Sequence, residues 1–123
     1  MKKQKITKVA SAESILKAAL KGIEDKKGES IIYINLKSVE NASAEYFVIC
    51  QAQSRTQVEA IADSVEHFIK ENVGENPWHV EGYQNAEWIL LDYVNVVIHV
   101  FQPDARIFYN LEKLWADGEI HKV

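Results

Sequence analysis

Two apolar runs lie almost next to each other between residues 87 and 101. The first reads EWILLDY (87–93) and the second NVVIHVF (95–101). Both are short and rich in β-branched or aromatic residues, which is typical of strands. Their tight join at Val94-Asn95 predicts a hairpin. Pro103 follows, at a position where a helix can begin without a backbone N–H donor. The segment therefore constrains the fold to a sheet with a helix directly after two of its strands.

Two earlier helices are predicted from serine caps followed by apolar residues at helical spacing. Ser11 precedes one such run and Ser54 precedes the other. Ser54 and Gln57 fit a capping box, in which the glutamine side chain reaches back to the serine N–H. The expected buried faces are Ala12, Ile15, Leu16, Ala19 and Ile23 in the first helix, Val58, Ile61, Ala62, Val65 and Ile69 in the second, and Ile107, Phe108, Leu111, Leu114 and Trp115 in the helix after Pro103.

Shorter apolar runs at residues 31–36, 45–51 and 78–82 complete the predicted strands. The element order αββαβββα indicates an α/β fold, with one mixed five-stranded sheet and helices packed on it. The step from the second strand through the second helix is compatible with a right-handed parallel crossover. We expect a single domain over residues 11–117, with a flexible basic tail at 1–10 and a C-terminal tail at 118–123.

Charge is distributed unevenly along the chain. Four lysines lie in the first eight positions, whereas the remaining chain carries 10 basic and 18 acidic groups. Lys70 is the only basic residue between Arg55 and Arg106. Nucleic-acid binding draws most of its affinity from Lys and Arg contacts with phosphates, so this interval favours a basic protein surface as partner. Plain solubility also explains an acidic surface, and charge alone leaves both interpretations open.

The sequence offers no signal for a membrane or for secretion. No apolar run approaches the ~20 residues that cross a bilayer, and none follows the N-terminal lysines. The single cysteine, Cys50, has no partner for an intrachain disulfide. We therefore expect no membrane contact and a cytoplasmic location.

No residue is assigned a catalytic, cofactor-binding or metal-binding role. The histidines His67, His79, His99 and His121 show no metal-ligand spacing and are interpreted as packing or surface residues. Cys50 has no basic neighbour in its strand to stabilise a thiolate, and is interpreted as structural.

A nucleotide-binding or nucleotidyl-transfer enzyme is the main enzymatic alternative. The strand–loop–helix order at residues 50–55 is where a phosphate-binding loop would lie. The loop contains no glycine that would let backbone N–H groups approach a phosphate closely. Ser54 is therefore interpreted as a helix cap rather than as a phosphate ligand.

The candidate binding residues lie on the strand at 87–93. Because side chains alternate along a strand, Trp88, Leu90 and Asp92 are predicted on one face and Tyr93 on the other. Tryptophan and tyrosine are frequent anchors in protein interfaces, although an ordinary core position also explains Trp88. The predicted partner-binding residues are Glu87, Trp88, Leu90, Asp92 and Tyr93.

Several segments, taken in order, carry a resemblance to a known family. They are EYFVIC, Ser54 with VEAIADSVE, Glu81-Gly82, EWILLDY, VVIHVF, and the final block from Arg106 through Tyr109 to LEKLW. Their order and spacing resemble the ribosomal silencing factors, the Iojap family. The resemblance extends from about Ile15 to Trp115.

The resemblance implies a nucleotidyltransferase-like fold without that fold's catalytic residues, and no cofactor. It implies binding to the large ribosomal subunit through its fourteenth ribosomal protein, at the face that meets the small subunit. A protein bound there would sterically block subunit association and repress translation. A homodimer of the free protein, or another self-associating module built on the exposed strand or the last helix, stays as a further alternative.

Residue by residue, the family's binding tryptophan matches Trp88, and its acidic–aromatic strand end matches Asp92 and Tyr93. Three positions depart from the family pattern. Glu45 replaces an aspartate, Ala52-Gln53-Ser54 replaces Gly-x-Ser, and Val94-Asn95 replaces a Gly-Asp turn. Because valine resists positive φ, we expect a different turn or a left-handed residue at Asn95.

Overall fold

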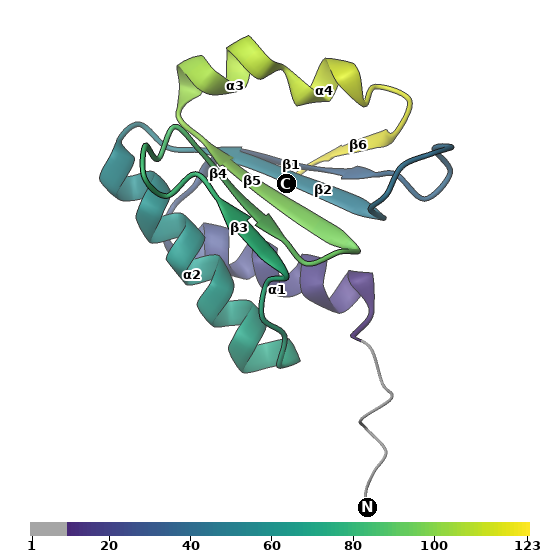
Figure 1. Cartoon of the computed structure of the whole chain (residues 1–123), viewed down its shortest axis with the longest axis horizontal. Coiled ribbons are helices and arrows are strands. Elements are labelled where there is room, and N and C mark those ends of the chain that lie inside the picture. Colours follow the sequence, from purple (N-terminus) through teal and green to yellow (C-terminus); the bar gives the residue numbers. More distant parts are fainter. Residues whose placement is uncertain (1–9) are drawn as a thin grey trace, which may run out of the picture.

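A mixed sheet of six strands lies between two layers of helix (Figure 1). The computed structural model describes residues 10–123, so the predicted basic tail at 1–10 lies outside the described residues except for Ala10. The elements are α1 (Ala12–Asp25), β1 (Glu29–Asn35), β2 (Tyr46–Gln51), α2 (Arg55–Val73), β3 (His79–Glu81), β4 (Trp88–Asp92), β5 (Val96–Phe101), α3 (Pro103–Tyr109), α4 (Leu111–Leu114) and β6 (Glu119–Lys122).

The strands of the sheet follow the order β3-β4-β5-β2-β1-β6. The strands β2 and β5 pair in parallel. The strand that follows α2 is β3, which runs antiparallel to β4, and β4 runs antiparallel to β5; β3 is therefore parallel to β2, as predicted for the step across α2. The other neighbouring strands pair antiparallel. The hairpin of β4 and β5 is also confirmed, with Leu90 opposite His99.

The predicted count of five strands is wrong, because β6 adds a sixth strand at the edge beside β1. This strand occupies most of residues 118–123, which the sequence analysis treated as a tail. Its four residues, EIHK, hold one aliphatic side chain and therefore lack the apolar run that marks a buried strand. The edge pairing is supported by the His121 ring, which stacks on Tyr33 with centroids 4.7 Å apart.

Helices α1 and α2 cover one face of the sheet (Figure 1), and their predicted apolar stripes are buried against it. Both serine caps are confirmed: Ser11 accepts from the N–H of Ser14, and Ser54 accepts from the N–H of Gln57. The second half of the capping box differs from the prediction. The Gln57 side chain accepts from the Ser54 hydroxyl at 3.4 Å, instead of reaching back to the serine N–H.

Gly22 allows the two helices to approach closely. A Cβ at this position would lie 2.8 Å from the Cα atom of Val65. The Ser64 hydroxyl donates a 2.8 Å hydrogen bond to the Gly22 carbonyl across the same contact. This junction fixes how α1 and α2 lie against each other, and hence how they cover β4 and β5.

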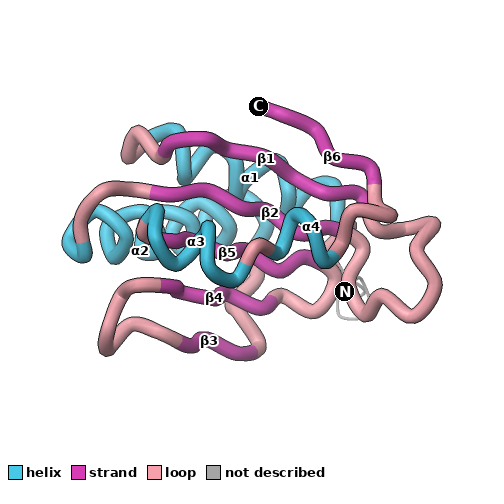
Figure 2. The backbone as a smooth tube through the Cα atoms, turned by 90° about the horizontal axis from the view of Figure 1, so that it is seen from above, coloured by secondary structure: helices cyan, strands magenta, loops and turns pink. Residues whose placement is uncertain are grey.

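Helices α3 and α4 run over the middle of the opposite face and leave β3 and β4 uncovered by helix (Figure 2). The predicted burial of the last helix is correct at Leu111, which is 8% exposed, and Trp115 is partly buried. It is wrong at Ile107, Phe108 and Leu114, which are 75%, 80% and 70% exposed. The helix breaks at Asn110, which has a left-handed φ of 47°, so apolar positions on one sequence stripe do not share a face.

Arg106 fastens α3 to the sheet. Its guanidinium donates to both the Ser30 carbonyl at 2.8 Å and Gln51 Oε1 at 3.1 Å. Its other nitrogens donate to the Glu112 carboxylate at 3.1 and 2.9 Å. The side chain is 9% exposed, so one buried cation joins β1, β2, α3 and α4.

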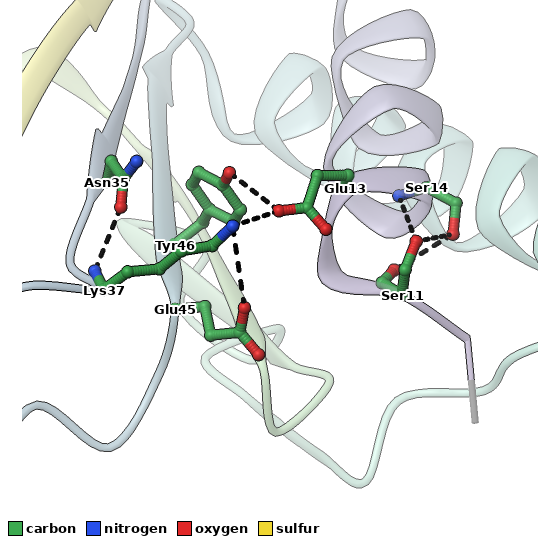
Figure 3. A network of polar contacts seen from close by, with 7 residues as sticks. All are labelled: Ser11, Glu13, Ser14, Asn35, Lys37, Glu45 and Tyr46. Atoms are coloured by element: carbon green, nitrogen blue, oxygen red, sulfur yellow. Dashed lines mark hydrogen bonds and ion pairs between the residues drawn. The ribbon is translucent and has the colours of Figure 1, made fainter.

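A polar network ties the start of α1 to the strands at the other end of the sheet (Figure 3). The Lys37 ammonium binds the Glu13 carboxylate and lies 4.0 Å from that of Glu45. The Tyr46 hydroxyl also donates to Glu13, at 3.1 Å. Lys37 lowers the pKa of Glu13 by direct hydrogen bonding, and Glu13 raises the pKa of Lys37 in return.

Within residues 10–123, no helix combines the length and the apolarity that a bilayer crossing requires.

Candidate protein-binding face

The strand β4 places Trp88, Leu90 and Asp92 on the face of the sheet opposite α1 and α2. Ile89 and Leu91 alternate with them and are fully buried in the helix-side core. Glu87 directly precedes the strand and is exposed. The predicted alternation is therefore confirmed. We call these four residues, Glu87, Trp88, Leu90 and Asp92, the β4 face.

Tyr93 does not lie with the other four predicted site residues. Its side chain is 6% exposed and belongs to the helix-side core. This position agrees with the predicted alternation, in which Tyr93 lies on the face opposite Trp88, Leu90 and Asp92. Burial raises the pKa of the Tyr93 phenol, with the negative charge of Glu66 as a second cause. Tyr93 therefore packs in the core between the sheet and the layer of α1 and α2.

Trp88 is partly buried by aromatic neighbours that hold its ring in place. The Tyr109 ring centroid lies 4.6 Å from that of Trp88, and the Phe101 centroid lies 5.1 Å away. The indole N–H donates to Nδ1 of His99 at 3.1 Å. Trp88 is thus partly a core residue, because its ring packs on Tyr109 and Phe101. It is also partly a surface residue, because the side chain is not fully buried.

His99 lies beneath the β4 face and is 3% exposed. Burial lowers the pKa of the imidazole to about 3, so the ring is neutral at physiological pH. Since Trp88 can only donate, Nδ1 of His99 accepts and the ring proton sits on Nε2. That Nε2 is buried and has no hydrogen-bond partner among the described residues.

The turn after β4 is strained. Two expectations were open for it, a different turn or a left-handed residue at Asn95, and the second is wrong. Val94 itself adopts the positive φ, at 73°. The Asn95 N–H bonds to the Tyr93 carbonyl at 2.9 Å, two residues back, so Val94 is the centre of a γ-turn. The Asp92 carboxylate accepts from the Val94 N–H at 2.7 Å and stabilises this turn. Asp92 therefore has a structural role besides its exposure on the β4 face.

Two aromatic residues near Trp88 were missed as surface residues. Tyr109 is 50% exposed and Phe108 is 80% exposed, and their rings meet edge to face with centroids 5.0 Å apart. The helical stripe assigned Phe108 to the core, whereas the break at Asn110 turns it outward. Two sequence signals could have predicted a short helix here: Pro103 at its start and Asn110 at its end.

The described residues offer little for metal or thiolate chemistry. Within residues 10–123, no three His, Cys, Asp or Glu side chains converge as a candidate metal site. Burial raises the pKa of the Cys50 thiol to about 12, which keeps it protonated. Ser54 caps α2, and the hydroxyl that a phosphate would need is engaged there. The β4 face instead presents the aromatic ring of Trp88, fixed by its neighbours, beside the carboxylates of Glu87 and Asp92. This combination suits recognition of a protein surface.

The chain matches the family model described as "Ribosomal silencing factor during starvation" over residues 9–123. It is similar to the ribosomal silencing factor of Bacillus subtilis, at 41% identity over 108 residues, 88% of this chain and 90% of the relative. It is also similar to that of Halalkalibacterium halodurans, at 40% identity over 108 residues, 88% of this chain and 91% of the relative.

A solved structure has the same arrangement. The crystal structure of a protein from Chromobacterium violaceum superposes with a TM-score of 0.81 at 33% sequence identity. The match covers 86% of this chain and 87% of that one. Sequence and fold therefore agree over most of the described residues.

Proposed function

The chain belongs to the family of ribosomal silencing factors, and from this premise we propose that it binds the large ribosomal subunit through large-subunit ribosomal protein fourteen. Bound there, it blocks association with the small subunit by steric exclusion and so represses translation. The proposal assigns the protein no bond-making step and no cofactor. It also places the protein in the cytoplasm, where ribosomal subunits join.

Together with family membership, the β4 face is the observation that carries this proposal. Trp88 is partly exposed and is held by Tyr109, Phe101 and His99. A ring already fixed in place loses little conformational entropy when a partner covers it. Glu87 and Asp92 lie at the two ends of the strand and add negative charge at the rim. Such a rim favours encounter with a basic protein surface.

Steric exclusion fits a small rigid domain. A folded chain of this length has a radius of gyration of about 14 Å. A body of that size, seated where two subunits must meet, separates surfaces that otherwise come into contact. The strength of repression is then set by how tightly the β4 face binds, because no catalytic turnover contributes.

The direct test is sedimentation of the purified protein with isolated ribosomal subunits in a sucrose gradient. We expect the wild type to comigrate with large subunits and to lower the yield of joined ribosomes when small subunits are added. Trp88→Ala should lose most of the comigration. Leu90→Lys should do the same, because it places a positive charge at a neutral, partly exposed position that would face a basic partner.

Trp78→Ala is the matched control. Trp78 is 79% exposed, and its neighbour His79 lies opposite Asp92, so alternation directs Trp78 away from the β4 face. Thermal unfolding of each variant separates lost binding from lost folding. Comigration that is unchanged in both Trp88→Ala and Leu90→Lys would remove the β4 face from the proposal. A wild type that stays at the top of the gradient would remove the function.

We also propose that the fold is nucleotidyltransferase-like without its catalytic residues. The likeness of the fold rests on the family resemblance, and the glycine-free loop between β2 and α2 and the capping role of Ser54 support the lack of catalytic residues. The enzymatic alternative predicts heat on mixing with ATP, CTP or GTP and Mg²⁺. Calorimetric binding of any of these, or release of pyrophosphate, would favour an enzyme over the proposed binding protein.

Self-association of the free protein is a second proposal with its own observation. Ile107, Phe108 and Leu114 are large apolar side chains exposed on α3 and α4. Surfaces of this kind often mark protein contacts. Light scattering over a range of concentrations should show a dimer, and Ile107→Ser should shift the equilibrium toward monomer. A mass that stays monomeric at every concentration would contradict the dimer.

A further inference from the structure

A surface hollow lies next to the β4 face, where α3 meets the start of β4. It has a volume of about 420 Å³ and is lined by Glu87, Gln102, Asp104, Ala105, Phe108 and Tyr109. We call it the Phe108 hollow. The Tyr109 ring forms its border with the β4 face, since Tyr109 also contacts Trp88 at 4.6 Å between centroids. A partner seated on Trp88 therefore reaches the hollow directly.

The chemistry of the hollow is negative and aromatic. Glu87 and Asp104 are both exposed, and neither forms an ion pair with another described residue. None of the residues that line it is basic. Phe108 is 80% exposed and meets Tyr109 at an interplanar angle of 90°, so the two rings present differently oriented faces to a ligand.

The backbone around the hollow is well fixed. The Gln102 N–H donates to the Glu87 carbonyl at 2.8 Å, and Gln102 Nε2 donates to the Ala86 carbonyl at 3.0 Å. These bonds join the end of β5 to the residue that precedes β4. The backbone beside Glu87 is consequently fixed before a partner binds, so that filling the hollow requires little backbone reordering.

On the premise of the proposed function, we propose that the Phe108 hollow receives a lysine or arginine side chain of the protein partner that docks on the β4 face. A cation beside two carboxylates is electrostatically favourable, and its approach to the faces of Phe108 and Tyr109 adds a cation–π attraction. A metal ion fits less well, because among the described residues no third His, Cys, Asp or Glu side chain converges with the two carboxylates.

The test is titration of the full-length protein with purified ribosomal protein fourteen, and with isolated large subunits, at several salt concentrations. Glu87→Gln and Asp104→Asn should each raise Kd about two- to fivefold. The double variant should raise it about tenfold if the two effects combine independently. The double variant should also bind with a weaker dependence on salt, because a charge contact has been removed. Phe108→Ala should raise Kd about two- to fivefold.

Glu71→Gln is the matched control, since Glu71 is exposed on α2, behind the opposite face of the sheet. It changes the net charge by the same amount as each single carboxylate variant and should leave Kd and salt dependence unchanged. Partner variants that replace single basic residues by alanine complete a double-mutant cycle. One of them should lose its effect in the Asp104→Asn background, because the two changes remove the same contact.

The outcomes separate this inference from the function on which it rests. If Trp88→Ala abolishes binding while the double carboxylate variant binds like the wild type, the hollow is not used and the proposed function stands. An effect of Glu71→Gln equal to that of Glu87→Gln or Asp104→Asn would show a general charge effect and overturn the hollow. If the wild type binds neither probe, the function fails and the occupant proposed for the hollow fails with it.

Discussion

The indole N–H of Trp88 donates a 3.1 Å hydrogen bond to Nδ1 of His99 on the adjacent strand. Because tryptophan can only donate, this bond requires an unprotonated Nδ1. It therefore links the orientation of the exposed ring to the protonation of a residue beneath it. Phe47 closes the other side of His99, with ring centroids 4.8 Å apart.

This relationship predicts a loss of stability in acid. Burial holds the pKa of His99 at about 3 in the folded protein, against 6.5 for an ordinary histidine. Between these values the unfolded chain binds a proton that the folded chain does not, so unfolding is favoured as pH falls. Above about pH 6.5 the full stability is present. Below it, His99 should remove about 1.4 kcal/mol per pH unit until the pH nears the folded pKa.

Urea unfolding at a series of pH values checks this, with His99→Asn as the comparison. The asparagine oxygen can still accept from Trp88, but the side chain does not titrate. The His99→Asn variant should be less stable than the wild type at pH 7, because the smaller side chain leaves a cavity. Its free energy of unfolding should fall less as the pH is lowered. Equal slopes for wild type and variant below pH 6.5 would show that His99 does not carry the effect.

The strained turn predicts that Val94→Gly stabilises the protein. A non-glycine residue in the left-handed region costs roughly 1–2 kcal/mol, and valine is among the least suited. Glycine removes this strain but adds freedom to the unfolded chain, which offsets about 0.5–1 kcal/mol. The urea midpoint should therefore rise modestly. Val94→Ala, which keeps the Cβ but loses the branch, should fall between the two, and a lower midpoint for Val94→Gly would contradict the strain.

The junction of α1 and α2 predicts that Gly22→Ala destabilises despite the better helix propensity of alanine. The added Cβ would lie 2.8 Å from the Val65 Cα, which is backbone and cannot rotate away. Forcing the helices apart should cost about 1–3 kcal/mol, measured by chemical unfolding. Lys21→Ala, exposed on the same helix, should change stability little. If Gly22→Ala melts like Lys21→Ala, the close approach is not tight in solution.

Arg106 should be more important for folding than any other charged residue of α3. Arg106→Met leaves the Glu112 carboxylate, the Ser30 carbonyl and Gln51 Oε1 without their donor, and should cost about 2–4 kcal/mol. Replacing Glu112 with leucine in the same chain should recover part of that loss, since the stranded charge is gone. Thermal unfolding of the single and double variants measures the recovery. Additive losses would indicate that the pair is not coupled.

The predictable part of the fold came from periodicity. The stripe from Val58 to Ile69 and the cap at Ser54 are local signals, and the structure confirms them. The alternation along β4 correctly separated Trp88 from Ile89, because a strand period of two needs no knowledge of its neighbours. The same rule placed Tyr93 on the other face, and the resemblance to the family kept it among the predicted partner-binding residues.

The missed part depends on contacts that local pattern does not encode. The strand β6 exists because β1 offers it an edge, while its own residues carry a weak strand signal. Phe108 is exposed because Asn110 takes a left-handed conformation that ends α3 early. Val94 takes a conformation that its side chain opposes, held by the pairing of β4 with β5 and by Asp92. For β6 and Val94, tertiary structure overrides local preference, whereas Asn110 follows the tendency of asparagine to end a helix in the left-handed conformation.

The single-residue alternation of β4 has a consequence for how the protein can change. Neighbouring residues in the strand have different environments: Ile89 and Leu91 are buried in the core, while Trp88 and Leu90 are partly exposed. Point substitutions can therefore retune recognition without touching the interior. A one-residue insertion or deletion within the strand would instead exchange the two sets, exposing aliphatic side chains and burying Asp92. We expect lineages of this chain to vary here by substitution and to place length changes in the turns.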